Sequence, residues 1–232
     1  EKVVAALDGT LEPKVASSSI QDSIEAALAD PEGETLRKQL LLSSNVPAEQ
    51  AASMLADGVL DGRFHLKHWD HEVEQWIFRV NALSLWCPEL ETPEFTADDR
   101  RFILEQLCLG CVSAKEVQGR RVKPILRDWL SPAHATALDE YVPDRVRLPS
   151  GRRIRVIYAE NDAPTISVRI QDLFGVNCPL TIAMNRQRLR IQILAPNQRP
   201  VQVTDDPIGF WRDTYPAVKK QLQKKYPKHE WR

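Results

Sequence analysis

The apolar residues of this chain change their spacing most clearly close to residue 147, and that change limits the folds open to it. Before it, apolar residues recur every three to four positions in segments bounded by proline and glycine. After it, the run RRIRVIY (152–158) alternates apolar residues with arginine, which is the period of two expected of a β-strand. The sequence therefore predicts an α+β fold, with helices first, then a small mixed or antiparallel β domain closed by a C-terminal helix.

Prolines and capping residues divide the helical part. Pro47 suits the first turn of one helix, Pro88 ends another, Thr96 begins a third, and Ser131 followed by Pro132 opens a fourth. The predicted helices cover residues 20–31, 34–42, 47–58, 73–85, 96–108, 121–130 and 132–141.

The first residues complete the predicted organisation. Short apolar runs at 2–7 and 14–20 predict a β-hairpin, which is too small to be stable alone. We therefore expect a hairpin remnant of a preceding region over 1–20, a helical domain over 21–146 and a β-rich domain with a terminal helix over 147–232. The chain opens in mid-pattern without an initiator methionine, which favours a fragment of a longer protein.

Composition excludes several classes of protein. Of the 232 residues, 43% are hydrophobic and 27% charged, as in ordinary soluble domains. No apolar run approaches the roughly 18 residues of a membrane span, so we expect no membrane contact. The four cysteines do not form a small secreted scaffold, which favours a reducing, cytoplasmic setting. Cys108 and Cys111 form a CxxC on an apolar helix, and we predict buried structural thiols rather than a redox pair.

Charge is divided unequally along the chain. Residues 145–232 hold 17 Lys and Arg against 7 Asp and Glu, a net charge of +10, whereas residues 1–144 hold 14 against 25, a net charge of −11. Such a division is typical of a protein with a nucleic-acid-facing end and a protein-facing end. Mutual packing of the two halves would give the same division.

Two basic stretches are candidates for phosphate contact. In a strand over 186–193, three arginines would share one face and three apolar residues the other. Such a strand can follow a phosphate backbone, although a solvated outer sheet face has the same pattern. Lysines in the terminal helix also complement its dipole. The predicted nucleic-acid-binding residues are Arg186, Arg188, Arg190, Arg212, Lys219, Lys220, Lys224, Lys225 and Lys228.

The terminal helix also has an aromatic and aliphatic stripe. Its residues follow helical spacing, and core packing explains such a stripe more simply than a platform for stacking bases. Alternatively, Thr214 caps a second helix that has Pro216 in its first turn. The stripe comprises Trp211, Tyr215, Val218, Leu222 and Tyr226.

We find no catalytic or metal-binding motif. The sequence has no GxxxxGK[ST] phosphate loop, no GxGxxG, no HExxH and no GxSxG. His65, His68 and His71 look like a metal cluster, but the outer two would lie roughly 240° apart around a helix, so we predict an exposed polar turn. An independent enzyme would instead require a concave pocket with converging polar groups.

Longer motifs carry a family resemblance. The runs RIQDLFG (169–175) and LAPNQRPVQVTDDPIGFWRDTYPAVKKQLQKKYPKHEW (194–231) closely resemble the C-terminal region of the bacterial HrpB family of ATP-dependent helicases. Residues 147–158 and 81–90 resemble further stretches of the family. The departures, such as Lys224-Lys225 for the usual Gly-Arg, keep or add positive charge.

The resemblance implies a role within a larger machine. The family belongs to the DEAH-box-like superfamily 2 RNA helicases, whose ATP-hydrolysing motor, with ATP and Mg²⁺, lies in two RecA-like domains upstream of this region. It implies no catalytic residue and no cofactor in this fragment, which would not itself be an enzyme. We expect an accessory region that packs on the motor domains and contacts single-stranded RNA. The alternative is a protein-interaction or scaffold module of the helicase without direct nucleic-acid contact.

Overall fold

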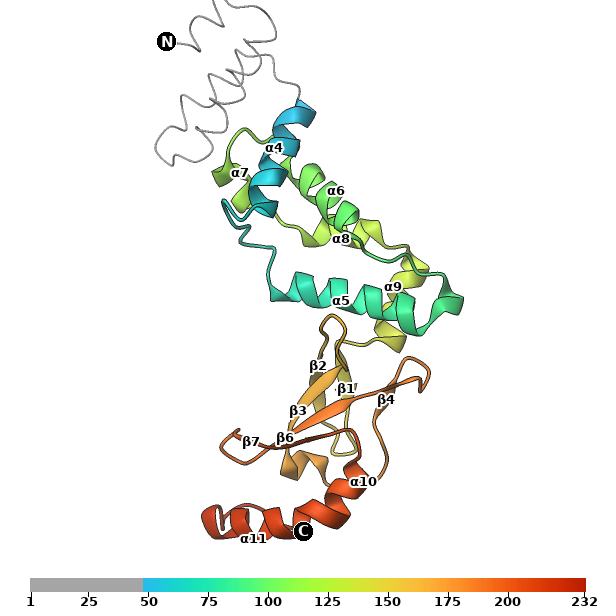
Figure 1. Cartoon of the computed structure of the whole chain (residues 1–232), viewed down its shortest axis with the longest axis vertical. Coiled ribbons are helices and arrows are strands. Elements are labelled where there is room, and N and C mark those ends of the chain that lie inside the picture. Colours follow the sequence, from blue (N-terminus) through green and yellow to red (C-terminus); the bar gives the residue numbers. More distant parts are fainter. Residues whose placement is uncertain (1–47) are drawn as a thin grey trace, which may run out of the picture. The chain divides into compact units, whose positions relative to one another are not determined.

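The structure is a computed structural model that describes residues 48–232. The predicted hairpin over 1–20 and the predicted helices over 20–31 and 34–42 lie outside the described residues. The rest combines helices with a small mixed sheet and a C-terminal helix, which confirms the α+β fold class (Figure 1). No helix in the described part of the chain is long and apolar enough to cross a membrane.

The chain divides into two compact units. The described part of the helical unit comprises residues 48–73 and 96–129, and the sheet unit comprises Glu74–Phe95 and Leu130–Arg232. Their division crosses helix α5 (His71–Trp86), whereas the change from helices to strands falls at β1 (Arg145–Arg147). The predicted domain boundaries remain predictions.

The helical unit is built around two packed helices. Helix α4 (Ala48–Leu60) lies against α6 (Ala97–Cys108) (Figure 1). Buried side chains along both helices, among them Leu55 and Leu104, form the core of this unit. The shorter helices α7 (Ala114–Gln118) and α8 (Lys123–Trp129) complete it.

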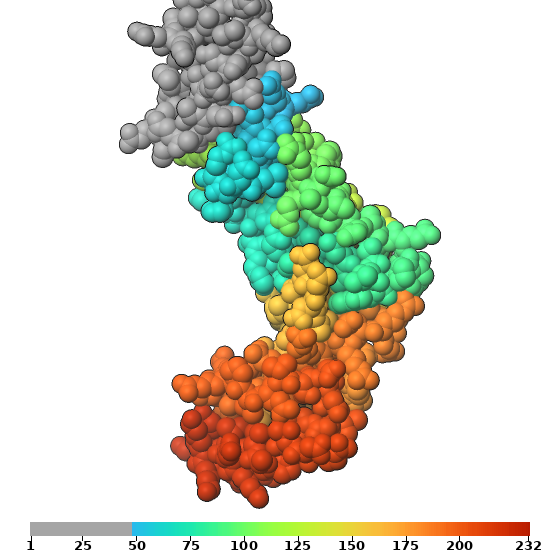
Figure 2. Space-filling view, viewed as in Figure 1, coloured from blue at the N-terminus to red at the C-terminus, as the bar shows by residue number. Residues whose placement is uncertain are grey.

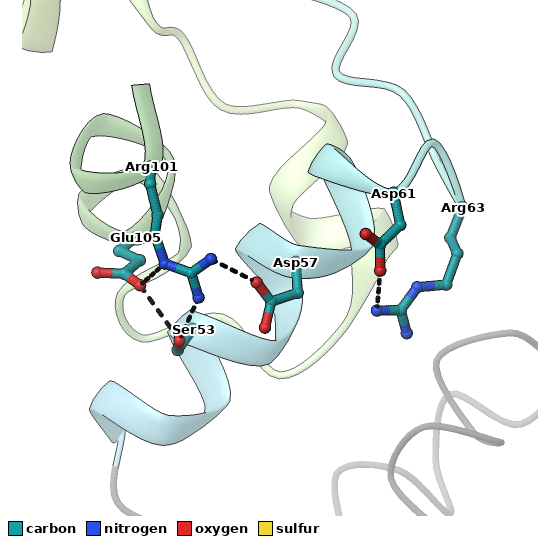
Figure 3. Close-up of polar contacts among 6 residues, drawn as sticks. All are labelled: Ser53, Asp57, Asp61, Arg63, Arg101 and Glu105. Carbon is teal, nitrogen blue, oxygen red and sulfur yellow. Dashed lines mark hydrogen bonds and ion pairs between the residues drawn. The ribbon is translucent and has the colours of Figure 1, made fainter. Parts of the chain in front are cut away.

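A polar network also joins α4 to α6. Arg101 of α6 lies 2.8 Å from Asp57 of α4, and its guanidinium donates to Ser53 of α4 at 3.2 Å. Both Arg101 and Ser53 donate to Glu105 at 3.1 Å (Figure 3). The Arg101 and Asp57 side chains are about two-fifths exposed (42% and 41%), so solvent screens these ion pairs and they contribute little to the stability of the unit.

The start of α6 is a capping box, as Thr96 predicts. The main-chain amide of Asp99 donates to the Thr96 hydroxyl at 3.3 Å, and the Thr96 amide donates to the Asp99 carboxylate at 2.9 Å. Trp129 donates to the same carboxylate at 3.1 Å. Burial raises the pKa of Asp99, but the hydrogen bonds from Thr96 and Trp129 together outweigh it and lower that pKa.

The CxxC lies at the end of α6, and both thiols are buried and free, as predicted. Burial raises the pKa of Cys108 to about 12 and also raises that of Cys111, which keeps both protonated and unreactive. Arg120 donates to the carbonyl oxygens of Leu107 and Leu109 at 2.9 and 2.8 Å, which satisfies main-chain acceptors at this helix end.

The sheet unit contains a five-stranded sheet in the order β1-β2-β3-β6-β7. Neighbours are antiparallel except β3 and β6, which are parallel and joined by a crossover over residues 170–189. That crossover holds the short helix η2 (Ile170–Leu173) and a two-stranded ribbon. The strands are β1 (Arg145–Arg147), β2 (Arg153–Ile157), β3 (Thr165–Arg169), β4 (Thr181–Ile182), β5 (Gln187–Arg188), β6 (Arg190–Leu194) and β7 (Pro200–Thr204).

Helix α5 is tied to the rest of the sheet unit by two buried polar side chains. Arg79 donates to the carbonyl oxygens of Val142 and Leu138 at 2.6 and 3.3 Å, at the end of α9 (Pro132–Tyr141). The Gln75 side chain donates to the Tyr158 carbonyl at 2.7 Å and accepts from the Tyr158 amide at 2.9 Å. These bonds satisfy main-chain groups that burial would otherwise leave unpaired.

The terminal segment forms α10 (Pro207–Gly209), the π-helix η3 (Phe210–Thr214) and α11 (Tyr215–Lys225). Asp206 caps α10, because its carboxylate accepts from the Gly209 amide at 3.0 Å. A second helix does follow Thr214, but no side-chain hydrogen bond from Thr214 caps it.

The sequence misplaced parts of the β domain. A single strand over 186–193 is wrong, because Arg186 lies in a turn and β5 and β6 belong to different sheets. The chain changes sheets at Leu189, whose amide donates to the Leu180 carbonyl at 2.8 Å. The strands β1 and β4 and the helix α7 have no counterpart in the predictions.

Candidate nucleic-acid interface

The three arginines predicted on one strand have three different environments. Arg186 donates to the Trp86 carbonyl at 3.0 Å and to Glu89 at 2.7 Å, and that hydrogen bond lowers the pKa of Glu89. Arg190 of β6 is paired with Asp162 at 2.7 Å. Arg188 of β5 is exposed and has no side-chain partner within residues 48–232. Carboxylates therefore already hold two of the three guanidinium groups.

Two of the predicted residues near the C-terminus are also engaged. Arg212 makes a two-pronged pair with its neighbour Asp213, at 2.7 and 2.8 Å, and this pair lowers the pKa of Asp213. Lys219 donates to the Arg232 carbonyl at 2.8 Å, and Tyr215 donates to the same oxygen at 3.1 Å. Lys219 thus helps to hold the last residues against α11.

The remaining lysines lie on the outer side of the terminal segment. Lys220, Lys224 and Lys228 are exposed and have no partner in the described part of the chain. Lys225 lies over the Tyr226 ring, 5.7 Å from its centroid. In the space-filling view the C-terminal segment (red) forms part of the surface of the sheet unit (Figure 2).

Tyr215 of the aromatic stripe is buried and Trp211 packs against it, which confirms the predicted core packing of these two residues; the other three are half-buried. Trp211 donates to the Val176 carbonyl at 2.9 Å. Its ring lies 4.8 Å from that of Tyr215 and 5.7 Å from that of Phe174. Because these rings are used in packing, they do not offer a stacking platform for bases.

Sequence reasoning missed one concentration of arginines, on the ribbon formed by β1 and β2. The register of the ribbon sets Arg145 opposite Arg155 and Arg147 opposite Arg153. Side chains directly opposite each other in a ladder share a face, so the four arginine side chains leave the ribbon on the same face. We call these four residues the arginine ladder. The alternation in RRIRVIY was its only visible signal, because the partner strand β1 has just three residues.

A groove adjoins the ladder within the sheet unit. It has a volume of about 440 Å³, and its lining includes Arg145 and Arg147 of β1 together with the turn that joins β4 to β5. Glu140 and Tyr141 from the end of α9 also line it. Thus a polar hollow lies directly beside half of the ladder.

The turn that lines this groove has an unusual backbone. Ala183, Met184 and Asn185 are consecutive non-glycine residues in the left-handed region, with φ of 51°, 55° and 67°. Each costs roughly 1–2 kcal/mol relative to the right-handed conformation. The turn is held by a 2.8 Å bond from the Ala183 amide to the Tyr141 carbonyl and a 2.6 Å bond between Thr181 and Asn185.

The described residues do not bring three or more histidine, cysteine or acidic side chains together as a metal site. His65 and His68 lie in the turn before α5, and His71 begins that helix. All three histidines are exposed, whereas Leu66, which lies between His65 and His68, is buried. Their arrangement agrees with the polar turn that their spacing predicts.

Comparison with known proteins shows which class of protein this chain belongs to. Residues 103–232 match the family model described as the ATP-dependent helicase C-terminal region, HrpB_C. The chain is 32% identical over 181 residues to the ATP-dependent RNA helicase HrpB of Escherichia coli K12, covering 76% of this chain and 22% of that protein. It thus spans about a fifth of the length of this curated relative.

Solved structures agree. A crystal structure of the E. coli DExH-box NTPase HrpB matches 81% of this chain with a TM-score of 0.70 and 30% identity. A second crystal structure, of the Escherichia coli DEAH/RHA helicase HrpB, matches the same share with a TM-score of 0.63 and 29% identity. In each case the match covers 24% of the solved chain. The class is therefore the C-terminal region of an ATP-dependent helicase.

Within that class, the chain belongs to the HrpB family, as the motifs in residues 169–231 predict.

Proposed function

We propose that this chain is a non-catalytic accessory region of an ATP-dependent RNA helicase, and that it contacts single-stranded RNA through its basic C-terminal third. It would pack on the motor domains of the longer protein, which would bind ATP and Mg²⁺, while this region would need no cofactor of its own. The proposal rests on family membership together with the small share, 22%, of the helicase relative that the chain spans.

One observation carries the RNA contact. Lys220, Lys224 and Lys228 extend from one terminal segment into solvent and lack carboxylate partners among residues 48–232. Unpaired ammonium groups along one exposed segment can neutralise successive phosphates without reading bases. Paired groups such as Arg212 would first have to give up an existing ion pair.

The proposal is tested by measuring how RNA binding depends on salt. The triple variant K220Q/K224Q/K228Q and the unaltered chain would be titrated with a fluorescent oligouridylate over a series of salt concentrations. We take the salt slope as the magnitude of the negative slope of log K against log salt concentration. Each lost phosphate contact on a single strand lowers this magnitude by about 0.7, so we expect the salt slope to fall by about 2.

A matched control removes the same charge elsewhere. K67Q/K115Q/K123Q neutralises three lysines of the helical unit and should leave the slope unchanged. If the unaltered chain does not bind oligouridylate in a salt-dependent way, the proposed RNA contact is wrong. Equal slopes for the triple variant and the unaltered chain would exclude the terminal lysines as its site.

A protein-interaction role is the second candidate, and one feature favours it. Phe102 of α6 is 54% exposed, and Leu85 of α5 is 75% exposed, although single exposed apolar residues are common in monomers. A scaffold role predicts that F102S weakens binding of the chain to the helicase motor domains while oligouridylate binding is unchanged. Pull-down with purified motor domains would distinguish the two candidates.

A further inference from the structure

The arginine ladder places like charges where a fold avoids them. Two pairs of arginines, Arg145 with Arg155 and Arg147 with Arg153, stand directly opposite each other in the register of β1 and β2. Opposite side chains in such a ladder are roughly 5 Å apart at Cβ, and the next pair along the strand is roughly 7 Å away. Like charges set directly opposite destabilise a sheet.

Arg145 and Arg155 each interact with another group, so the unpaired charge of the ladder lies on Arg147 and Arg153. The carboxylate of Asp144 lies 3.8 Å from Arg145, and Glu140 lines the adjacent groove. Arg147 and Arg153 are exposed and have no carboxylate partner in the part of the chain that the structure describes. Arg152, in the turn between the strands, is instead paired with Asp172. The ladder therefore retains a net positive charge.

The groove beside the ladder is a second feature, independent of the arginines, that points to a ligand site. Its wall includes the turn of three left-handed residues, 183–185. Backbone strain of this kind persists where surrounding contacts enforce it, and it is concentrated at ligand sites and clamps. The Thr181 and Asn185 side chains add hydrogen-bonding groups to the same wall.

We propose that the arginine ladder, with the adjoining groove, binds the phosphates of a nucleic-acid strand. The inference rests on the proposed RNA contact and assigns its principal site to the β1–β2 ribbon rather than to α11. Bound phosphates would lie between opposing guanidinium groups and remove their mutual repulsion. Arginine suits this role because its planar fork donates two parallel hydrogen bonds to phosphate oxygens.

The register of the ribbon fixes the geometry of the site. Gly151 has φ of 82° in the turn between β1 and β2, and the Leu148 amide donates to the Arg152 carbonyl at 2.9 Å, which closes the hairpin. The arginines are therefore held on paired strands rather than on flexible loops. A preorganised site loses less conformational entropy when it binds.

The test combines binding and stability of the whole chain. The cross-strand variant R147Q/R153Q would be titrated with fluorescent oligouridylate over a range of salt concentrations. Because each lost phosphate contact lowers the slope by about 0.7 for a single strand, we expect a slope lower by about 1.4. R63Q/R127Q, which removes two arginines of the helical unit, should leave the slope unchanged.

Stability should change in the opposite direction. Removing two facing positive charges relieves repulsion within the ribbon, so we expect the Tm of R147Q/R153Q to rise by roughly 1–3 °C. Weaker binding together with a higher Tm cannot come from misfolding. Unchanged binding, or a lower Tm with weaker binding, would overturn the inference.

Competition experiments identify the ligand. Uridine monophosphate and oligoglutamate would each compete with the labelled oligouridylate on the unaltered chain. Weak competition by both supports a strand of nucleic acid. Strong competition by the mononucleotide would indicate a site for a single phosphate, and strong competition by oligoglutamate would indicate a protein-docking site; either result overturns the proposal.

The two proposals fail in distinguishable ways. A slope that falls for K220Q/K224Q/K228Q but not for R147Q/R153Q would overturn the ladder and leave the proposed RNA contact standing. A slope that falls for R147Q/R153Q alone would support the ladder and remove the lysines from the contact. If the unaltered chain does not bind oligouridylate, both proposals are wrong.

Discussion

Arginine serves two different purposes in two parts of the sheet unit. Between α5 and α9, Arg79 is only 8% exposed and donates to two main-chain carbonyls and to Asp139. On the β1–β2 ribbon, four arginines face one another and Arg147 and Arg153 lack carboxylate partners in the described chain. The first arrangement satisfies groups that the fold has buried, whereas the second adds repulsion to it.

The comparison shows which positive charges need a ligand to explain them. Lysines near the C-terminal end of α11 complement the helix dipole, so the fold alone accounts for part of their presence. Arg186, Arg190 and Arg212 are accounted for by their carboxylate partners. Within residues 48–232 the ladder sets arginine opposite arginine, which costs stability, and we therefore assign the principal phosphate site to it.

The largest expected effect is on Arg79. Arg79→Met keeps much of the side-chain volume but leaves the carbonyls of Leu138 and Val142 without this donor. We expect the free energy of unfolding to fall by about 2–4 kcal/mol, measured by urea denaturation. Asp139→Asn is the control, because the Asp139 side chain is 81% exposed, and it should change stability by less than about 1 kcal/mol. A loss for Arg79→Met as small as that of the control would remove the contrast with the ladder.

Trp211 tests the same distinction within the terminal segment. Trp211→Phe preserves an aromatic ring but removes the bond to the Val176 carbonyl. We expect a loss of about 1–2 kcal/mol in the free energy of unfolding, with the salt slope of oligouridylate binding unchanged under native conditions. A lower slope in this variant would mean that the packed ring contributes to nucleic-acid contact.

Asp99 provides a pH-dependent example in the helical unit. The hydrogen bonds to its carboxylate lower its pKa in the folded chain, so its contribution is present above the unfolded pKa of about 3.9 and is lost as pH falls through the folded value. Asp99→Asn should cost about 1 kcal/mol near neutral pH. Urea denaturation should show this difference shrinking as the pH falls below about 4. A difference that stays constant with pH would contradict the assignment.

The smallest expected effect concerns a paired arginine. Asp162→Asn removes the carboxylate that holds Arg190 and should make that guanidinium available to phosphate. If Arg190 lies within reach of the bound strand, the salt slope would rise by up to about 0.7. An unchanged slope would confine the contact to the ladder and to unpaired lysines, and so sharpen the comparison.

Local patterns were sufficient to predict most elements of the fold. The helix start at Thr96 and the helix after Ser131 and Pro132 both depend on residues close together in sequence. The inward aromatic stripe ending at Tyr226 follows from helical spacing in the same way. These features are set within one or two turns of chain, which is why spacing alone reveals them.

Features that depend on distant partners were not predictable in this way. The alternation around Leu189 resembles one strand, but the β4 partner draws residues 187–188 into a separate ribbon. Arg186 is engaged by Glu89, 97 positions earlier. The arginine ladder depends on the pairing register of the three-residue strand β1, and no local pattern sets that register.

The most direct test of the account is hydrogen–deuterium exchange of the whole chain with and without oligouridylate. We predict slower exchange of the main-chain amides of residues 145–157 and of the turn at 183–185 when oligouridylate is bound, with little change in α5 and α9. Protection confined to α11, or no protection anywhere in residues 145–232, would contradict the claim that the arginine ladder is the nucleic-acid site.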